Sequence, residues 1–271
     1  MEIKLQLPNG KDYLSYSSSK HLASHPLSYL SYINDKFEPN DGMIFGQFYE
    51  DLLFGVDTND DYFVYDEQKV IDKAIKTREA NGEKTKTVRA TNEYRQFKEE
   101  ALADVGNRKI ITAEQHEKAI RMGNIMRDSK VFDTQLNGEL QVTKSEVIDV
   151  DEFRVKALVK SDVVMPNQVV NDLKTTSSVM DGWIGQAKKL GYDLQAFLTY
   201  EVWNADDFNF IVQRTEGLHE IGIFNVERDG WFYNSGKAKF KQAIYNYLDF
   251  FSPEAKAMEA NPHNYVFKKF I

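Results

Sequence analysis

The fold of this chain is decided by the stretch Val169-Val170-Asn171-Asp172-Leu173-Lys174-Thr175-Thr176. Just upstream, apolar side chains alternate with charged ones from residue 153 to 161, and this period of two is typical of a half-buried strand. Pro166-Asn167 supplies a turn, and the quoted stretch then returns as a second strand. The resulting hairpin places Asp162 and Asp172 on neighbouring strands, although ten residues separate them in sequence.

This hairpin predicts a metal site. Side chains on a strand alternate between its two faces, so Asp172 and Lys174 project to the same side. Two carboxylates at one place repel each other, and a hard divalent cation between Asp162 and Asp172 would relieve that repulsion. The metal would polarise a phosphate and lower the pKa of a water, while Lys174 would orient the water or hold a phosphate oxygen. A surface hairpin with a solvated Asp/Lys pair is the alternative interpretation.

The same residues resemble a known group of nucleases. Asp162 followed by Asp172-Leu173-Lys174 resembles the D…(D/E)XK core of the PD-(D/E)XK nuclease superfamily. Residues 172–176, followed by Gly191-Tyr192-Asp193-Leu194-Gln195, are more closely similar to the DxKTT…GYxxQ pattern of its RecE-type (exonuclease VIII-like) and RecB-like branch of phages and prophages. A bare DxK is a weak signal, whereas DxKTT with a correctly placed YxxQ is a strong one.

The resemblance extends towards the N-terminus. Residues 46–50, Gly-Gln-Phe-Tyr-Glu, are similar to a family helix that reads G-x-x-x-H or G-x-x-x-E, with Glu50 where RecE-type proteins usually carry histidine. Residues 16–22 are similar to the family's YSxLKh opening, with Ser19 in place of the usual apolar residue. The resemblance therefore runs from about residue 13 to about residue 250.

A set of site residues is implied by this resemblance. Magnesium, for which manganese would substitute, would be held by Glu50, Asp162, Asp172 and the Leu173 carbonyl. Lys174 would position or deprotonate the attacking water, and Gln195 would orient that water or a phosphate. Serines at a helix start cap it and leave N–H groups that can bind an anion. The candidates for contact with DNA are Ser17, Ser19, Lys20, Thr175, Thr176 and Tyr192. A solvated Glu50, ordinary capping by the serines and simple packing by Tyr192 remain the alternatives.

Composition limits the protein class. A chain of 271 residues with 42% apolar content can bury a full core. We expect a single nuclease domain over residues 1–271, with a core at about 40–251, an N-terminal helical segment at 13–35 and a C-terminal tail at 252–271. The absence of cysteine excludes disulfides, thiolate zinc sites and the iron-sulfur cluster of Cas4-like and AddB-like relatives.

The charge of the chain is acidic. A net charge of −8 argues against a simple DNA-binding protein, but acids concentrate at metal sites and local basic patches matter more than the total. Residues 84–89 and Lys188-Lys189 are candidate patches, although ordinary solvated faces explain them more simply. Without a long apolar run or a basic-then-apolar N-terminus, we expect a soluble, cytoplasmic protein of a bacterial host cell, with no membrane partner.

Hydrophobic periodicity predicts an α/β fold with a central mixed β-sheet flanked by helices, and the resemblance implies a restriction-endonuclease-like core. The polar stretch 79–91 is the best candidate for a long loop. We expect strands at 61–66, 139–148, 152–164, 168–174, 207–214 and 219–227, and helices at 17–33 with a break at Pro26, 43–55, 92–105, 112–129, 178–189, 192–204 and 235–251.

The function implied by the resemblance is a magnesium-dependent DNA exonuclease. It would act 5′ to 3′ on double-stranded DNA ends and produce 3′ single strands for phage-type recombination, with a single-strand annealing recombinase as partner. Processive members of the family form rings around DNA, which implies a ring-shaped homo-oligomer. Two alternatives stay open: a structure-selective or restriction-like endonuclease with the same metal site, and a non-catalytic DNA-binding or assembly module.

Overall fold

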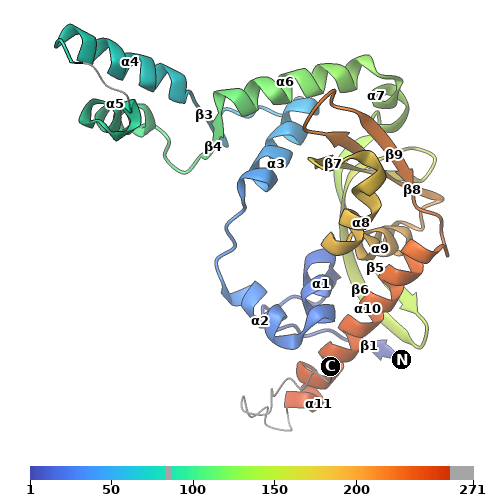
Figure 1. Cartoon of the computed structure of the whole chain (residues 1–271). Coiled ribbons are helices and arrows are strands. Elements are labelled where there is room, and N and C mark those ends of the chain that lie inside the picture. The colour runs from blue at the N-terminus through green and yellow to red at the C-terminus, as the bar shows by residue number, and fades with distance from the viewer. Residues whose placement is uncertain (84–86, 257–271) are drawn as a thin grey trace. The chain divides into compact units, whose positions relative to one another are not determined.

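The computed structural model describes residues 1–83 and 87–256, and the elements that it contains are labelled in Figure 1. The chain divides into two compact units. The first unit is Met1–Glu38 together with Val131–Ile271, and the second unit is Pro39–Lys130. A single domain over the whole chain stays a prediction, and most of the expected C-terminal tail lies outside the described residues.

The first unit is built on a seven-stranded mixed β-sheet. Strands β5, β6 and β7 form an antiparallel meander, β8 runs parallel to β7, and β9 returns antiparallel to β8. Two short strands, β1 and β2, add to β6 in parallel. The strands span β1 Glu2–Ile3, β2 Leu14–Ser15, β5 Glu139–Val150, β6 Phe153–Val164, β7 Val169–Thr176, β8 Asp207–Arg214 and β9 Ile221–Asn225.

The alternation that predicts β6 is confirmed, because every second residue from Phe153 to Val163 is buried. The predicted turn is confirmed as well: Met165 donates its N–H to the Val169 carbonyl, and Gln168 takes a left-handed conformation with φ 59°. The pairing of β5 with β6 passes over Gln141 and, opposite it, Asp162 without a change of register, and Gln141 has φ 55°.

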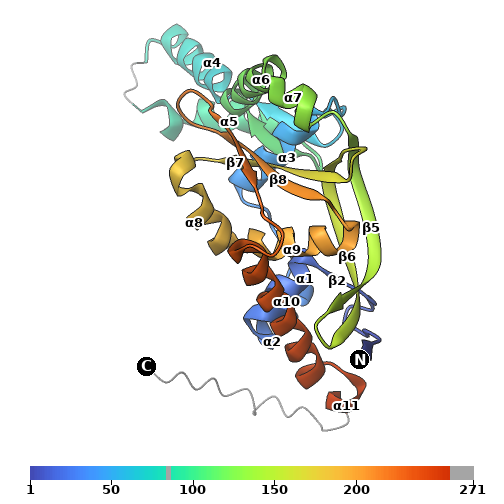
Figure 2. The same ribbon diagram turned by 90° about the vertical axis from the view of Figure 1, so that its right-hand side faces the viewer.

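Helices cover this sheet. Helices α8 and α9 form the crossover that a parallel β7–β8 pair requires. Helix α10 packs along α9 and α1 (Figure 2). Gly191 has φ 87° and ends α8 as a left-handed cap, as the sequence predicts. The helices span α1 Tyr16–Ser24, α2 Pro26–Asn34, α7 Lys130–Gln135, α8 Met180–Leu190, α9 Tyr192–Trp203, α10 Trp231–Phe250 and α11 Pro253–Lys256.

The second unit is mostly helical, with one two-stranded parallel sheet. The predicted capping box is present, because Thr112 and Gln115 exchange side-chain and backbone hydrogen bonds at the start of α6. Arg127, near the end of α6, donates to the carbonyls of Leu52 and Leu53 at the end of α3. The elements span α3 Asp41–Leu53, β3 Tyr62–Tyr65, α4 Glu67–Ala80, η1 Val88–Ala90, α5 Asn92–Leu102, β4 Lys109–Thr112 and α6 Ala113–Asp128.

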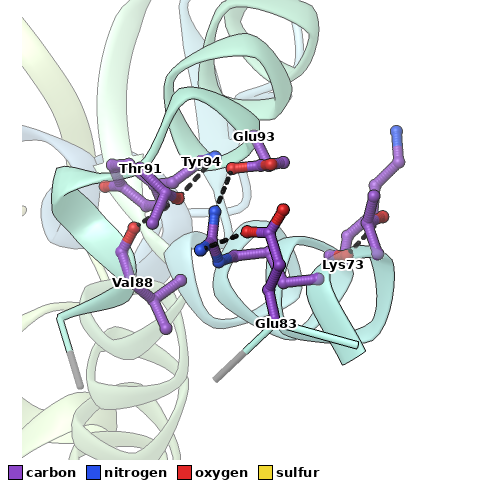
Figure 3. A network of polar contacts seen from close by, with 8 residues as sticks. Lys73, Glu83, Val88, Thr91, Glu93 and Tyr94 are labelled. Atoms are coloured by element: carbon purple, nitrogen blue, oxygen red, sulfur yellow. Dashed lines mark hydrogen bonds and ion pairs between the residues drawn. The ribbon is translucent and has the colours of Figure 1, made fainter. Parts of the chain in front are cut away.

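A polar network joins α4 to α5 (Figure 3). Arg78 on α4 contacts Glu93 at 2.9 Å and Glu83 at 2.5 Å. The hydroxyl of Thr91 donates to the Val88 carbonyl at 2.7 Å and accepts the Tyr94 N–H at 3.2 Å, so that Thr91 caps α5. These contacts hold the second helix of the pair against the first.

The structure differs from the sequence prediction in the elements whose sequence signal is weakest. Helix α4 was not predicted, and its end overlaps the expected loop at 79–91. Only Val70 and Ala74 are buried in α4, so its apolar stripe is too thin to be recognised. The strands β1, β2 and β4 contain two to four residues each, too few for an alternation to show. The patch residues 84–86 lie outside the described part of the chain.

Candidate active site

The site begins where β6 and β7 separate. These two strands are paired only at Val163–Asn171 and Val164–Val170, and beyond that point β7 pairs only with β8. Asp162 is the next residue of β6, and its Oδ2 accepts the backbone N–H of Leu173 at 2.9 Å. The carboxylate of Asp162 thus replaces the backbone carbonyl that a continued ladder would have offered. This confirms that the hairpin brings Asp162 beside the Asp172 segment.

Asp172 is the centre of the polar contacts. Its carboxylate is 3% exposed and forms an ion pair with the ammonium of Lys174 on the same face of β7. Gln195, on the first turns of α9, donates its side-chain N–H to Asp172 Oδ1 at 2.5 Å. The structure therefore brings together four of the predicted site residues: Asp162, Asp172, Lys174 and Gln195.

The charges at this place are not balanced. Burial and the neighbouring Asp172 carboxylate raise the pKa of Asp162 to about 7, against the smaller opposing effect of Lys174. Burial disfavours the ammonium of Lys174, but Asp172 and Asp162 outweigh that effect and raise its pKa above the usual value. Two acids thus share one base in a place largely removed from solvent.

The donor set fits a hard cation. Carboxylate oxygens are the preferred ligands of magnesium, and the elevated pKa of Asp162 reflects a repulsion that a cation beside Asp162 and Asp172 would relieve. Among residues 1–83 and 87–256, however, no three histidine, aspartate or glutamate side chains are clustered closely enough to hold a metal ion. The protein groups in place are therefore two carboxylates, and the Leu173 carbonyl remains a predicted third ligand.

Tyr192 covers the lysine. The ammonium of Lys174 lies 5.2 Å from the centroid of the Tyr192 ring, within the range of a cation–π contact. The ring of Tyr16 is 6.5 Å from the Tyr192 ring, and the Tyr16 hydroxyl donates to the Leu190 carbonyl at 2.8 Å. Sequence reasoning did not single out Tyr16 as a site residue, although it opens the YSxLKh-like segment.

The other predicted DNA contacts differ in exposure. Thr176 is buried and its hydroxyl contacts Gln186 at 2.7 Å, which makes it part of the link between β7 and α8. Ser19 is fully buried, so its hydroxyl is not presented to a phosphate. Ser17, Lys20 and Thr175 are partly exposed. The cap of α1 is formed by Ser15 and Ser18.

Glu50 lies on α3 in the second unit. The predicted apolar stripe of this helix is confirmed, because Phe45, Phe48, Tyr49 and Leu53 are buried. Glu50 itself is partly exposed. Its role as a metal ligand for Asp162 and Asp172 stays a prediction.

One supporting residue was missed by sequence reasoning. Asp193 stands between Tyr192 and Gln195, is fully buried, and pairs with the ammonium of Lys239 on α10 at 2.7 Å. The hydroxyl of Ser235 donates to the same carboxylate at 2.7 Å. This pairing fixes the first turn of α9, which presents both Tyr192 and Gln195. An acid in the first turn of a helix was the available signal, but capping explains such an acid equally well.

Comparison with known proteins shows the fold. No family model matches the chain, and no curated protein matches it. A crystal structure of a "Putative exonuclease" from Eubacterium rectale is similar over 96% of this chain and 90% of that one, with a TM-score of 0.56 and 16% identity. A phage-related exonuclease from Haemophilus somnus aligns over 65% of this chain and 90% of that one at 18% identity, with a TM-score of only 0.30. The mixed α/β architecture with its helix-flanked sheet is thus shared with the first of these structures.

In the part of the chain that the structure describes, no helix is both long and apolar enough to cross a membrane.

Proposed function

We propose that this chain is a metal-dependent deoxyribonuclease of the PD-(D/E)XK type, most similar to the RecE-type exonucleases. The observation that carries the proposal is the meeting of Asp162, Asp172, Lys174 and Gln195 at the point where β6 and β7 separate. A structural ion pair would need one acid for the lysine, whereas here a second acid lies near the pair and an amide donates to Asp172. The exonuclease fold shared with the Eubacterium rectale structure supports the same class.

The chemistry follows from the side chains. Asp162 and Asp172 would hold magnesium, with Glu50 and the Leu173 carbonyl completing the protein ligands. The bound ion would polarise the scissile phosphate and lower the pKa of the attacking water. Lys174 has a raised pKa and is therefore an ammonium, which supports a role in orienting the water or a phosphate oxygen rather than in deprotonating the water. Gln195 fixes the rotamer of Asp172 and can share in positioning the water.

The proposed substrate is the end of a linear DNA duplex. Digestion would run 5′ to 3′ and leave a 3′ single strand for an annealing recombinase, with Ser17, Lys20, Thr175 and Tyr192 as the proposed DNA contacts. A ring-shaped homo-oligomer would keep the enzyme on its strand. A monomer in light scattering would contradict the ring and leave the nuclease proposal untouched.

The decisive experiment is digestion of end-labelled linear duplex with and without magnesium. We expect nucleotide release only with magnesium or manganese, and loss of the 5′ label before the 3′ label. A closed circular duplex of the same sequence should stay intact, since cleavage of the circle would indicate an endonuclease. If neither metal supports release from linear DNA, the non-catalytic binding module is the better description.

A further inference from the structure

An aromatic pocket lies beside the proposed active site in the first unit. It encloses about 170 Å³ between the β8–β9 pair, α8 and the start of α10. Five of its ten lining residues are aromatic: Trp183, Phe210, Phe224, Trp231 and Phe232. Gly222 keeps this wall in place, because a Cβ there would come within 2.8 Å of the Phe224 ring. Aromatic rings thus form much of the wall of this pocket.

The pocket and the site share one face of the sheet. Asp172 on β7 is in register with Phe210 on β8, and Phe210 is in register with Phe224 on β9. Residues in register on adjacent strands project to the same face. The Tyr192 ring lies 5.7 Å from Phe210 and 5.2 Å from the Lys174 ammonium, so it joins the aromatic wall to the site. The aromatic wall and Asp172 therefore lie on the same face of the sheet.

The rim of the pocket suits a ligand that is both aromatic and anionic. Trp231 is 60% exposed, which is unusual for the largest apolar side chain. The ammonium of Lys188 lies 5.1 Å from the centroid of its ring. Asn225 gives its side-chain N–H groups to Asp207 and Asn209 and so keeps an oxygen for accepting hydrogen bonds. Glu227, also at the rim, offers a carboxylate acceptor for the N–H edge of a ring.

We propose that this pocket binds one unpaired nucleobase of a single DNA strand, which stacks on Trp231. The inference rests on the proposed function and extends it, because an exonuclease that works on a duplex end must hold bases that have lost their stacking partners. An aromatic side chain can replace the lost base–base stacking. It can do so for any of the four bases, because every base has a flat face. The Lys188 ammonium at the rim complements the phosphate of the same nucleotide.

The test is the binding of a labelled single-stranded oligonucleotide to the full chain, measured by fluorescence anisotropy in EDTA so that no metal-dependent cleavage occurs. Replacing Trp231→Ala should weaken binding about tenfold, which is within the range for the loss of one base–aromatic stack. Trp231→Tyr keeps a ring and should retain most of the affinity. Leu218→Ala is the matched control, because Leu218 is 84% exposed and outside the pocket lining, and it should bind like the wild type.

An oligonucleotide with abasic sites separates stacking from backbone contact. The wild type should bind it more weakly than the intact strand, whereas Trp231→Ala should bind both alike. The proposal is overturned if the wild type binds neither strand, if Trp231→Ala binds as tightly as the wild type, or if the two strands bind the wild type equally. Digestion of linear duplex with magnesium is measured separately. If the protein digests DNA and Trp231→Ala binds the single strand like the wild type, the base-binding pocket is contradicted and the nuclease proposal stands. If the protein does not digest DNA but binds the intact strand more tightly than the abasic one, the nuclease proposal is contradicted and the base-binding pocket stands.

Discussion

Two of the places where acidic and basic side chains meet can be compared, because the pKa values of Glu100 and Asp162 shift in opposite directions there. Between α4 and α5, the hydrogen bond from Lys73 to Glu100 at 2.8 Å lowers the pKa of the Glu100 carboxyl. At the β6–β7 separation, burial and a second carboxylate raise the pKa of Asp162 to about 7. In the first arrangement opposite charges stabilise each other, whereas in the second the carboxylates of Asp162 and Asp172 repel each other.

This difference distinguishes a structural network from a site. Each acid of the α4–α5 network has a basic partner in contact with solvent, so the network needs nothing further. The acids at the β6–β7 separation outnumber their one lysine, and Asp172 is buried while Asp162 is half-buried. Such an excess of buried charge is costly unless a ligand balances it, and it is therefore typical of functional sites.

The largest effect is expected from Asp172→Asn. This change keeps the shape of the side chain but removes its negative charge, so the proposed metal loses a ligand and Lys174 loses its ion-pair partner. Nuclease activity should fall below detection, while the circular dichroism spectrum should stay that of the wild type. Full activity in the variant would show that the site lies elsewhere.

A smaller loss is expected from Gln195→Ala. The change removes the 2.5 Å hydrogen bond to Asp172 and leaves both carboxylates and the lysine in place. We expect the turnover number to fall by about 10- to 100-fold, in line with the loss of a residue that hydrogen-bonds to a proposed metal ligand. Gln242→Ala, which removes an exposed contact to Asn246 on α10, is the matched control and should be fully active.

The stored repulsion predicts a pH dependence of stability in the absence of metal. The folded-state pKa of Asp162 lies above its unfolded value of about 4, so the folded protein binds the extra proton between about pH 4 and pH 7. The free energy of unfolding contributed by this group therefore falls as the pH rises through that window. The stability advantage of Asp162→Asn over the wild type should therefore grow by roughly 1–3 kcal/mol between pH 5 and pH 8.

Urea unfolding in EDTA at the two pH values measures this difference. An equal offset at pH 5 and pH 8 would mean that Asp162 does not titrate in this range. Adding magnesium at pH 8 should stabilise the wild type and leave Asp162→Asn unchanged, since only the wild type keeps both carboxylates.

The smallest effect is expected in the α4–α5 network. Glu100→Gln removes an ion pair whose two side chains are 57% and 47% exposed, and exposed pairs of this kind contribute little because water and salt screen them. Both the unfolding midpoint and the nuclease activity should match the wild type within error. A clear loss of activity in this variant would show that the α4–α5 network also contributes to function.

The sequence by itself determined the strands that carry the site. The alternation from Phe153 to Val163 and the turn at Pro166-Asn167 specify a hairpin, because both depend on local backbone preferences that neighbouring residues encode. The same is true of Gly191, whose left-handed φ of 87° ends α8 and begins the helix that carries Gln195. The residues of the site were therefore recognisable before their contacts were known.

Only the tertiary structure decided which charged and polar groups contact each other and which of them are buried. The sequence does not reveal that β6 and β7 separate at Asp162. It also does not reveal the ion pair between Asp193 and Lys239, or that Phe210 is in register with Asp172. Each of these facts depends on pairing between segments far apart in the chain. Burial of Ser19 and Thr176 was equally invisible, because a hydroxyl side chain carries no hydrophobic signal. Local pattern thus specified the strands and helices, and long-range packing decided which polar groups face each other without water.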